Sequence, residues 1–125
     1  MRAIKSEGTR PEESLSEILN DLGVRYKTHV RDLPGSPDAF AGEYGVALFV
    51  HGCFWHGHIG CRRSALPKSH RRFWSTKIAS NRRRDATAAR KLRRRGYHVL
   101  TIWACQLKNR NHIRNRIALA LSRAS

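Results

Sequence analysis

The chain has 125 residues, of which 40% are hydrophobic, and this composition excludes a wholly disordered tail. It contains no run of about 18 apolar residues, which excludes a membrane-spanning helix, and the N-terminal sequence MRAIKSEGTR lacks the apolar stretch of a secretory signal. The missing signal sequence leads us to expect a cytoplasmic protein. Since there is also no internal repeat and no Gly/Ser linker, we expect a single domain over residues 1–125.

The formal net charge of +16 is distributed unevenly along the chain. Eight of the nine acidic residues lie at or before Glu43, whereas residues 62–96 carry fourteen Lys or Arg and a single acid, Asp85. A block of this kind needs a polyanion or extensive solvation. Nucleic acid is therefore the first candidate partner, and a merely solvated basic face is the alternative.

The first predicted element is a helix that begins at residues 9–12 (TRPE), where a threonine cap is followed by a proline in the first turn and by Glu12 three residues after the cap. Glu12 thus has an ordinary structural role open to it, the closure of a capping box. Apolar residues then follow at helical spacing, and Gly23 is expected to end the helix. These apolar residues are Leu15, Ile18, Leu19 and Leu22.

Two strands and a turn are predicted next. Residues 25–30 alternate in the manner of a half-buried strand, and residues 33–38 (LPGSPD) form a turn that delivers Asp38 to the start of a further strand. Residues 45–50 (GVALFV) are a short apolar run that is typical of a strand buried on both faces.

The basic region predicts a long helix, in one or two pieces, that ends at Gly96. Its inward face follows from spacings of three and four residues: Trp74, Ile78, Asn81, Asp85, Ala88 and Leu92. Residues 97–103 (YHVLTIW) predict another strand, and Asn111 is expected to cap a last helix with an apolar inward face (Ile113, Ile117, Ala120 and Leu121). The predicted fold is α/β, with a mixed central sheet flanked by helices on both faces.

Residues 51–61 (HGCFWHGHIGC) hold two of the three cysteines and three histidines. Cys53, His58 and Cys61 are close in sequence, and Cys105 follows the last predicted strand. This Cys3His set accounts for every cysteine of the chain and suits zinc, and four protein ligands make a closed and therefore structural site. The alternative is three unrelated thiols.

Two histidines of the same segment, His51 and His56, remain free if the third binds zinc. In a chain charged for nucleic acid they indicate proton transfer near a phosphate. Asp85 shares the inward helix face, and Asp38 opens a strand, where an acid is disfavoured. With Glu12 these carboxylates would suit a Mg2+ site for phosphodiester hydrolysis. A buried salt bridge for Asp85 and a turn role for Asp38 are the structural alternatives.

Three motifs, HGCFWHGH, FWSTKIASNRRRD and RRGYHVLTIWAC, resemble the signature of the very short patch repair endonucleases, HGCFWH…C, FW..KI..N..RD and GW.VL..WEC. The N-terminal MRAIKSEGTRPE and the SPD turn fit the same register, so the resemblance covers essentially the whole chain. It implies a restriction-endonuclease-like fold with a structural zinc. It also implies an enzyme that nicks DNA on the 5′ side of the thymine in a T:G mismatch created by deamination of 5-methylcytosine.

The resemblance implies roles for the candidate catalytic residues. Asp38 and the backbone carbonyl of Val50 would bind Mg2+, and Glu12 would act on the metal through water. Val50 stands where the family has threonine, a change that a carbonyl ligand survives. His56 would be the general base for the attacking water. Two further residues would support the phosphate, the water or the orientation of this histidine: His51 and Asp85.

For the segment 51–61 the resemblance implies the same zinc ligands, Cys53, His58, Cys61 and Cys105. It further implies that two adjacent rings, Phe54 and Trp55, wedge into the DNA stack beside the mismatch, with Met1 entering from the other groove.

The expected partners are double-stranded DNA with a T:G mismatch, a cytosine methyltransferase and mismatch-repair proteins, and we expect a nucleoid-associated monomer without a membrane partner. Two alternatives stay open. One is a restriction-like nuclease of the same fold without mismatch specificity, and the other is a non-catalytic, zinc-stabilised nucleic-acid-binding module. The presence of Asp38, His51, His56 and Asp85 together disfavours the second.

Overall fold

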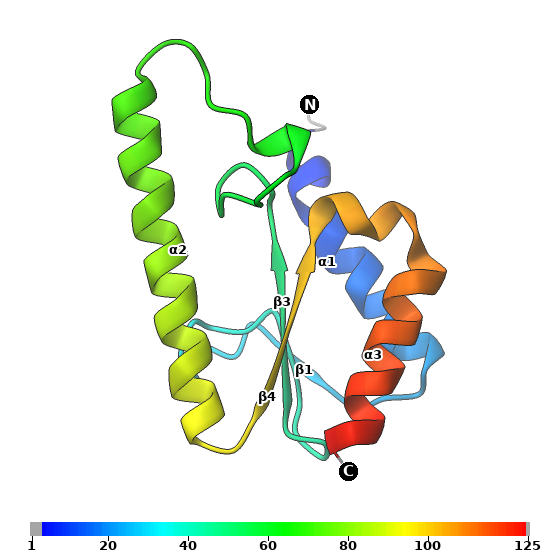
Figure 1. The fold of residues 1–125 in the computed structure, drawn as a ribbon. Helices are drawn as coiled ribbons and strands as arrows, with labels where there is room; N and C mark the ends of the chain where they lie inside the picture. The colour runs from blue at the N-terminus through cyan, green and yellow to red at the C-terminus, as the bar shows by residue number, and fades with distance from the viewer. Residues whose placement is uncertain (1–3, 125) are drawn as a thin grey trace.

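The structure, a computed structural model, describes the backbone of residues 4–124 and the side chains of residues 11–123. Figure 1 shows a central sheet with helices packed on either side. The elements in chain order are α1 (Ile4–Asp21), β1 (Lys27–Thr28), β2 (Ala39–Ala41), β3 (Val46–His51), the 3-10 helix η1 (Arg62–Ser64), α2 (Arg71–Arg94), β4 (His98–Trp103), the 3-10 helix η2 (Ala104–Lys108) and α3 (Arg110–Ala124).

The sheet has the strand order β1-β2-β3-β4. β1 and β2 are antiparallel, as are β2 and β3, whereas β3 and β4 are parallel, with Leu48 opposite Leu100. A parallel pair needs a long crossover connection, and α2 lies in that connection. The predicted mixed sheet is therefore confirmed.

The helices form a layer on each face of the sheet. α1 and α3 contact each other on one face, where α1 packs against β3 and α3 packs against β3 and β4, and α2 packs against β4 on the other face (Figure 1). This arrangement confirms the prediction of helices on both faces. Among the described residues, no helix is both long and apolar enough to cross a membrane.

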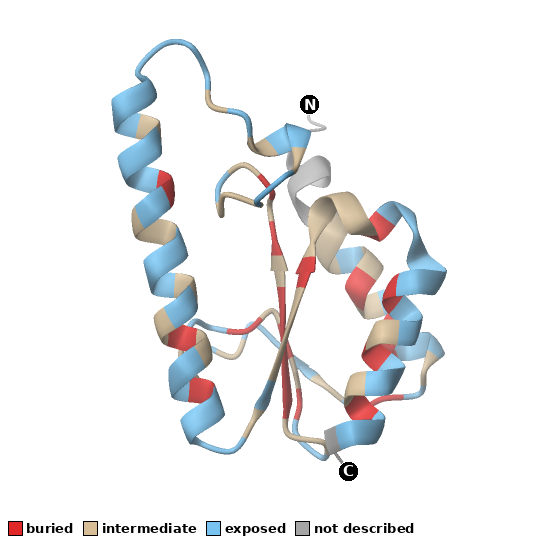
Figure 2. Ribbon diagram, in the orientation of Figure 1, coloured by how far each residue is buried: buried red, intermediate tan, exposed pale blue. Residues whose placement is uncertain are grey.

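The alternation of side chains along β3 divides the core in two. Val46 and Leu48 point into the larger core, which α1 and α3 close with fully buried residues such as Leu19 and Ile117. Ala47 and Phe49 point to the opposite face, where Leu92 of α2 covers them. Figure 2 shows the contrast: buried residues line the inner sides of α1 and α3, whereas α2 is exposed over most of its surface.

The turn before Asp38 approaches α2 and β3 so closely that it requires a glycine. Gly35 has a φ of +75°, and a Cβ atom placed there would lie 2.7 Å from the Cβ of Ala88 and 3.2 Å from the Phe49 ring. A side chain at this position would push the turn away from both elements. As predicted, the turn places Asp38 directly before a strand, since β2 begins at Ala39.

The structure corrects the predicted start of the first helix. α1 begins at Ile4, so the threonine that was predicted to cap the helix lies inside it, and Glu12 does not close a capping box. Pro11 also lies within the helix, where it lacks an N–H for the i to i−4 hydrogen bond. A capping signature shows where a helix can begin, and its contribution of about 1 kcal/mol does not prevent the chain from continuing the helix towards the N-terminus.

Two further boundaries differ from the predictions, those of β1 and α3, and one question left open by the sequence, the continuity of the basic helix, is answered. β1 contains only Lys27–Thr28, because His29 adopts a φ of +50°, which ends the extended backbone. The basic helix is one continuous element, Arg71–Arg94. α3 begins at Arg110, and the side chain of Asn109 accepts a hydrogen bond from the N–H of His112 at 3.3 Å, so Asn109 takes the capping role predicted for Asn111.

Candidate active site and metal centre

The loop that follows β3 is held against α2 by two contacts. Asn81 donates a hydrogen bond of 2.8 Å to the carbonyl of Trp55. Gly57 has a φ of +62°, and a Cβ atom there would lie only 2.6 Å from Cγ2 of Ile78 and 2.9 Å from Cδ of Arg82. The loop can therefore reach the helix only because residue 57 is a glycine.

The four predicted zinc ligands meet at the base of this loop. The ligand atoms of Cys53, His58, Cys61 and Cys105 all lie within 4.8 Å of one another. Sγ of Cys105 is 3.5 Å from Nδ1 of His58, and a tetrahedral zinc with ordinary Zn–S and Zn–N lengths separates two such atoms by about 3.6 Å. Loss of hydration and the two neighbouring thiols raise the pKa of Cys105 to about 11, a crowding that a bound cation would relieve. The cluster can therefore hold zinc.

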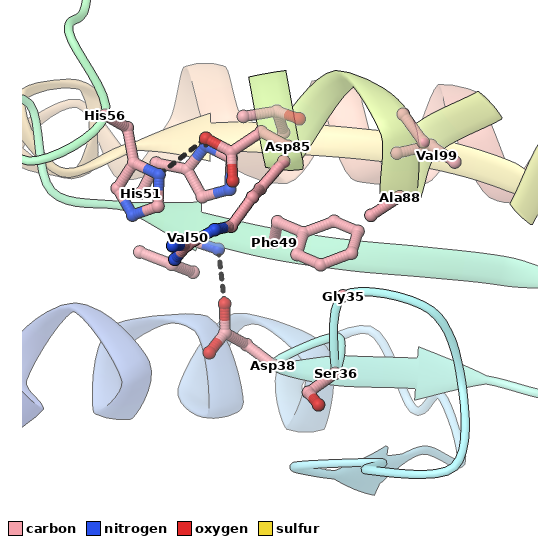
Figure 3. A pocket seen from close by; sticks show the side chains of 13 residues that line it. Gly35, Ser36, Asp38, Phe49, Val50, His51, His56, Asp85, Ala88 and Val99 are labelled. Atoms are coloured by element: carbon pink, nitrogen blue, oxygen red, sulfur yellow. Dashed lines mark hydrogen bonds and ion pairs between the residues drawn. The ribbon is translucent and has the colours of Figure 1, made fainter. Parts of the chain in front are cut away.

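A second group joins the end of β3, the loop and α2. Oδ2 of Asp85 lies 2.6 Å from Nδ1 of His56 and 3.9 Å from Nδ1 of His51. The two imidazole rings are stacked, with centroids 3.9 Å apart and planes 5° apart. Figure 3 shows Asp85 reaching from α2 towards both rings. If Asp85 accepts the Nδ1 hydrogen of His56, the Nε2 atom of that ring is left with a lone pair.

The environment of His51 keeps this histidine neutral. Burial and, to a smaller extent, the neighbouring His56 lower the pKa of His51 to about 4, against the opposing effect of Asp85. Nδ1 of His51 is buried and has no hydrogen-bond partner within the described part of the chain. A neutral ring stacked on His56 places no second positive charge beside that histidine.

Asp38 lies below His51 and His56 in the view of Figure 3 and is held in place by the backbone of β3. Its Oδ2 accepts a hydrogen bond of 2.7 Å from the N–H of Val50. Burial raises the pKa of Asp38, and the nearby charge of Glu12 raises it too, whereas the bond from Val50 lowers it. Two carboxylates held this close favour a cation between or beside them, and carboxylate oxygen is the donor that Mg2+ prefers.

One cavity of about 350 Å3 brings these groups together. Asp38, Val50, His51, His56 and Asp85 all line it. Five of the six predicted catalytic or Mg2+-binding positions thus surround a single space between the sheet and α2.

The sixth position, Glu12, lies at an adjoining cavity of about 490 Å3, which Asp38 also lines. Here the structure adds a residue that the sequence analysis missed. The ligand atoms of Glu12, His29 and Asp38 lie within 4.8 Å of one another, and Nε2 of His29 is 3.6 Å from Oε1 of Glu12. The strand register brings His29 to the site: the pairs Lys27 with Phe40 and Thr28 with Ala39 place His29 opposite Asp38, and this register follows from the structure rather than from the sequence.

Beyond the zinc-type cluster, the loop presents aromatic rings. Phe54 and Trp55 are 5.2 Å apart at 82°, and both contact Trp74 of α2, at 5.3 and 5.4 Å. Trp55 is 51% exposed, so the pair is not sealed within the core. Trp74 was predicted only as an inward-facing residue, and the structure shows it behind the two rings. Met1 lies outside the described residues, and its predicted contact with DNA is not placed.

The basic residues of α2 face solvent. All ten of them are exposed: Arg71, Arg72, Lys77, Arg82, Arg83, Arg84, Arg90, Lys91, Arg93 and Arg94. Arg84 also lines the cavity that contains Asp38 and Asp85. The helix therefore presents a row of cations beside the candidate active site.

Known proteins resemble this chain in sequence, and a solved structure resembles it in fold. A family model described as "DNA mismatch endonuclease Vsr" matches residues 1–63. The chain is 42% identical over 117 residues to the "Type II nicking enzyme V.XorIIP" of Xanthomonas oryzae pv. oryzae, covering 94% of this chain and 85% of that protein. It is 36% identical over 113 residues to the "DNA mismatch endonuclease Vsr" of Escherichia coli K12, covering 90% and 72%.

Among solved structures, the "Homing Endonuclease I-Bth0305I Catalytic Domain" is similar, with a TM-score of 0.66 and 22% identity over 91% of this chain and 95% of that chain. This likeness supports the endonuclease-type fold. The sequence relatives agree with the resemblance found in the three motifs. The chain therefore belongs to the DNA mismatch endonuclease Vsr family.

Proposed function

We propose that this DNA endonuclease of the Vsr family nicks one strand of a duplex on the 5′ side of the thymine in a T:G mismatch. The observation that supports it most is the convergence of Asp38 with the His51, His56 and Asp85 group around one cavity. Such a cavity beside exposed aromatic rings and a row of arginines suits a phosphodiester held in a distorted duplex.

In this proposal His56 is the general base. Asp85 fixes its Nδ1 at 2.6 Å, so Nε2 accepts a proton from the attacking water as the new bond to phosphorus forms and the bond to the leaving 3′ oxygen breaks. The imidazolium that results is stabilised by the carboxylate of Asp85. His51, neutral because burial lowers its pKa, packs against the ring and does not compete for the proton.

The proposed cation site is formed by Asp38, the carbonyl of Val50 and, through water, Glu12. The fit rests on the donor set, because the Glu12 and Asp38 carboxylates lie close enough that the charge of one raises the pKa of the other. Mg2+ bound there supplies positive charge to the scissile phosphate and to the leaving 3′ oxygen. Asp38, anchored to the N–H of Val50, sets where that charge lies relative to His56.

Zinc on Cys53, His58, Cys61 and Cys105 is proposed as structural. Three of the ligands come from the loop and the fourth, Cys105, lies two residues after Trp103, so they tie the loop to the end of β4. A closed four-ligand site leaves no open position for substrate.

Mismatch recognition is assigned to the aromatic rings. Trp55 is half exposed and is backed by Trp74, so it can enter a base step without losing its support. Unstacking a step costs a few kcal/mol, and a T:G wobble pair offers less resistance than a matched pair. The substrate would arise where a cytosine methyltransferase has acted, and mismatch-repair proteins are the proposed functional partners.

The test is a cleavage assay on end-labelled duplexes that are identical except for a T:G or a C:G pair, with and without Mg2+. We expect a single nick in the thymine strand of the T:G duplex, dependent on Mg2+ and abolished in Asp38→Ala. Equal cleavage of both duplexes would favour a nuclease without mismatch specificity. Tight binding with no product would favour a non-catalytic binding module.

A further inference from the structure

The cation site contains an imidazole in addition to its carboxylates. Nε2 of His29 lies 3.6 Å from Oε1 of Glu12, and both atoms lie within 4.8 Å of a carboxylate oxygen of Asp38. Ligands of one octahedral cation at about 2.1 Å are about 3.0 Å apart when adjacent and about 4.2 Å apart when opposite. Nε2 of His29 lies within 4.8 Å of a carboxylate oxygen of Asp38, so a small rotation of the exposed His29 side chain brings these two atoms to such a separation. Glu12 is close enough to act on the same cation through water.

The backbone directs His29 to this place. Its N–H donates a hydrogen bond of 3.2 Å to the carbonyl of Asp38, which continues the hairpin register past the end of β1. Its φ of +50° turns the chain out of the extended conformation at that residue. His29 is therefore positioned through Asp38 itself, the residue that anchors the proposed site.

A surface ion pair between His29 and Glu12 is the simpler interpretation. The two side chains are 60% and 42% exposed, and an exposed pair of this kind contributes between zero and about 1 kcal/mol. An ion pair explains the contact between His29 and Glu12, but it does not explain why a carboxylate oxygen of Asp38 lies within 4.8 Å of both. A shared cation accounts for all three ligand atoms and offsets the repulsion between the two carboxylates.

We propose that His29 is a nitrogen ligand of the cation held by Asp38 and, through water, by Glu12, and that the site therefore binds Mn2+ and Co2+ in preference to Mg2+. Imidazole nitrogen is a good ligand for first-row transition ions, whereas Mg2+ is hard and selects oxygen. The inference rests on the proposed cation site at Asp38 and specifies its metal preference.

The experiment measures metal binding directly, on the full chain with its zinc content verified. Mn2+ and Mg2+ affinities are obtained by titration calorimetry, and the Mn2+ complex is examined by pulsed electron paramagnetic resonance for coupling to imidazole nitrogen. The test variant is His29→Asn, because asparagine tolerates a positive φ but does not reach the cation. The matched control is His70→Asn, since His70 is also exposed and has a φ of +57°.

We expect the wild-type protein to bind Mn2+ more tightly than Mg2+ and to show nitrogen coupling. In His29→Asn the coupling disappears and the Mn2+ affinity falls by about 10- to 100-fold, while Mg2+ affinity changes little and His70→Asn behaves as wild type. Persistent coupling in His29→Asn, or its absence from wild type, overturns the proposal. Asp38→Asn separates the two hypotheses: if it leaves binding of both ions intact, the proposed cation site itself is wrong.

Discussion

The stacked pair of His51 and His56 shows how a fold assigns different tasks to two similar side chains. His51 belongs to β3, so the pleat points it to the α2 face and burial lowers its pKa to about 4. His56 belongs to the loop, is less buried, and has the nearer carboxylate, at 2.6 Å. In the proposed mechanism the pair therefore provides one neutral support, His51, and one base, His56.

Asp85→Asn tests this division. Asparagine keeps the size of the side chain but provides no negative charge for a protonated His56, so we expect the cleavage rate constant to fall by about 100-fold or more while DNA affinity is retained. Single-turnover rates and binding titrations measure the two quantities. Asp32→Asn removes the same charge from an exposed turn residue and should match wild type. A rate constant for Asp85→Asn within about twofold of wild type would contradict the assignment.

Residues that share one helix face were predictable, and residues that meet across a hairpin were not. The spacing of three and four placed Asp85 on the inward stripe with Ile78, Ala88 and Leu92, and the last three are buried. Helical periodicity is a local property of sequence. His29 reaches Asp38 only through a strand register and a positive φ, neither of which a single sequence reveals before the turn between them is known.

The loop after β3 and helix α2 act as one unit because a glycine allows their contact. Gly57→Ala adds a Cβ atom 2.6 Å from Ile78 and also strains a φ of +62°. Gly60→Ala imposes the same kind of strain at a φ of +78° with nothing within 4 Å, which makes it the matched control.

We expect Gly60→Ala to cost about 1–2 kcal/mol of folding free energy and Gly57→Ala to cost about 1–3 kcal/mol more. Only Gly57→Ala should also slow cleavage, since the loop carries His56 and the aromatic rings. Denaturant unfolding and the nicking assay give both quantities. Equal losses of stability in the two variants would show that the contact with α2 is unimportant.

Charge is unevenly distributed over the molecule as it is along the chain, although α3 also carries exposed cations such as Arg114. The exposed cations of α2 lie on one side of the sheet, and α1, with Glu12, Glu13 and Glu17, lies on the other. The candidate active site lies at the edge of the basic side. DNA laid along α2 would thus bring its backbone to the cavity, where Asp38 and Glu12 form the proposed cation site.

Arg83→Gln should weaken binding to T:G and matched duplexes by the same factor, because a phosphate contact carries no sequence information. The slope of log affinity against log salt concentration should become shallower by about one unit. Fluorescence anisotropy over a range of salt concentrations measures it. Arg114→Gln, an exposed cation on α3, should leave the slope unchanged. If Arg114→Gln alters the slope as much as Arg83→Gln does, the DNA does not lie along α2.

The cysteine and histidine cluster spans the ends of β3 and β4, which are parallel neighbours in the sheet. A ring that is driven between stacked bases experiences an equal reaction force from the duplex. If the cluster holds zinc as proposed, that load would pass from the loop directly into two hydrogen-bonded strands of the sheet. A mobile loop would yield instead, and the bases would close again before the backbone could be cut.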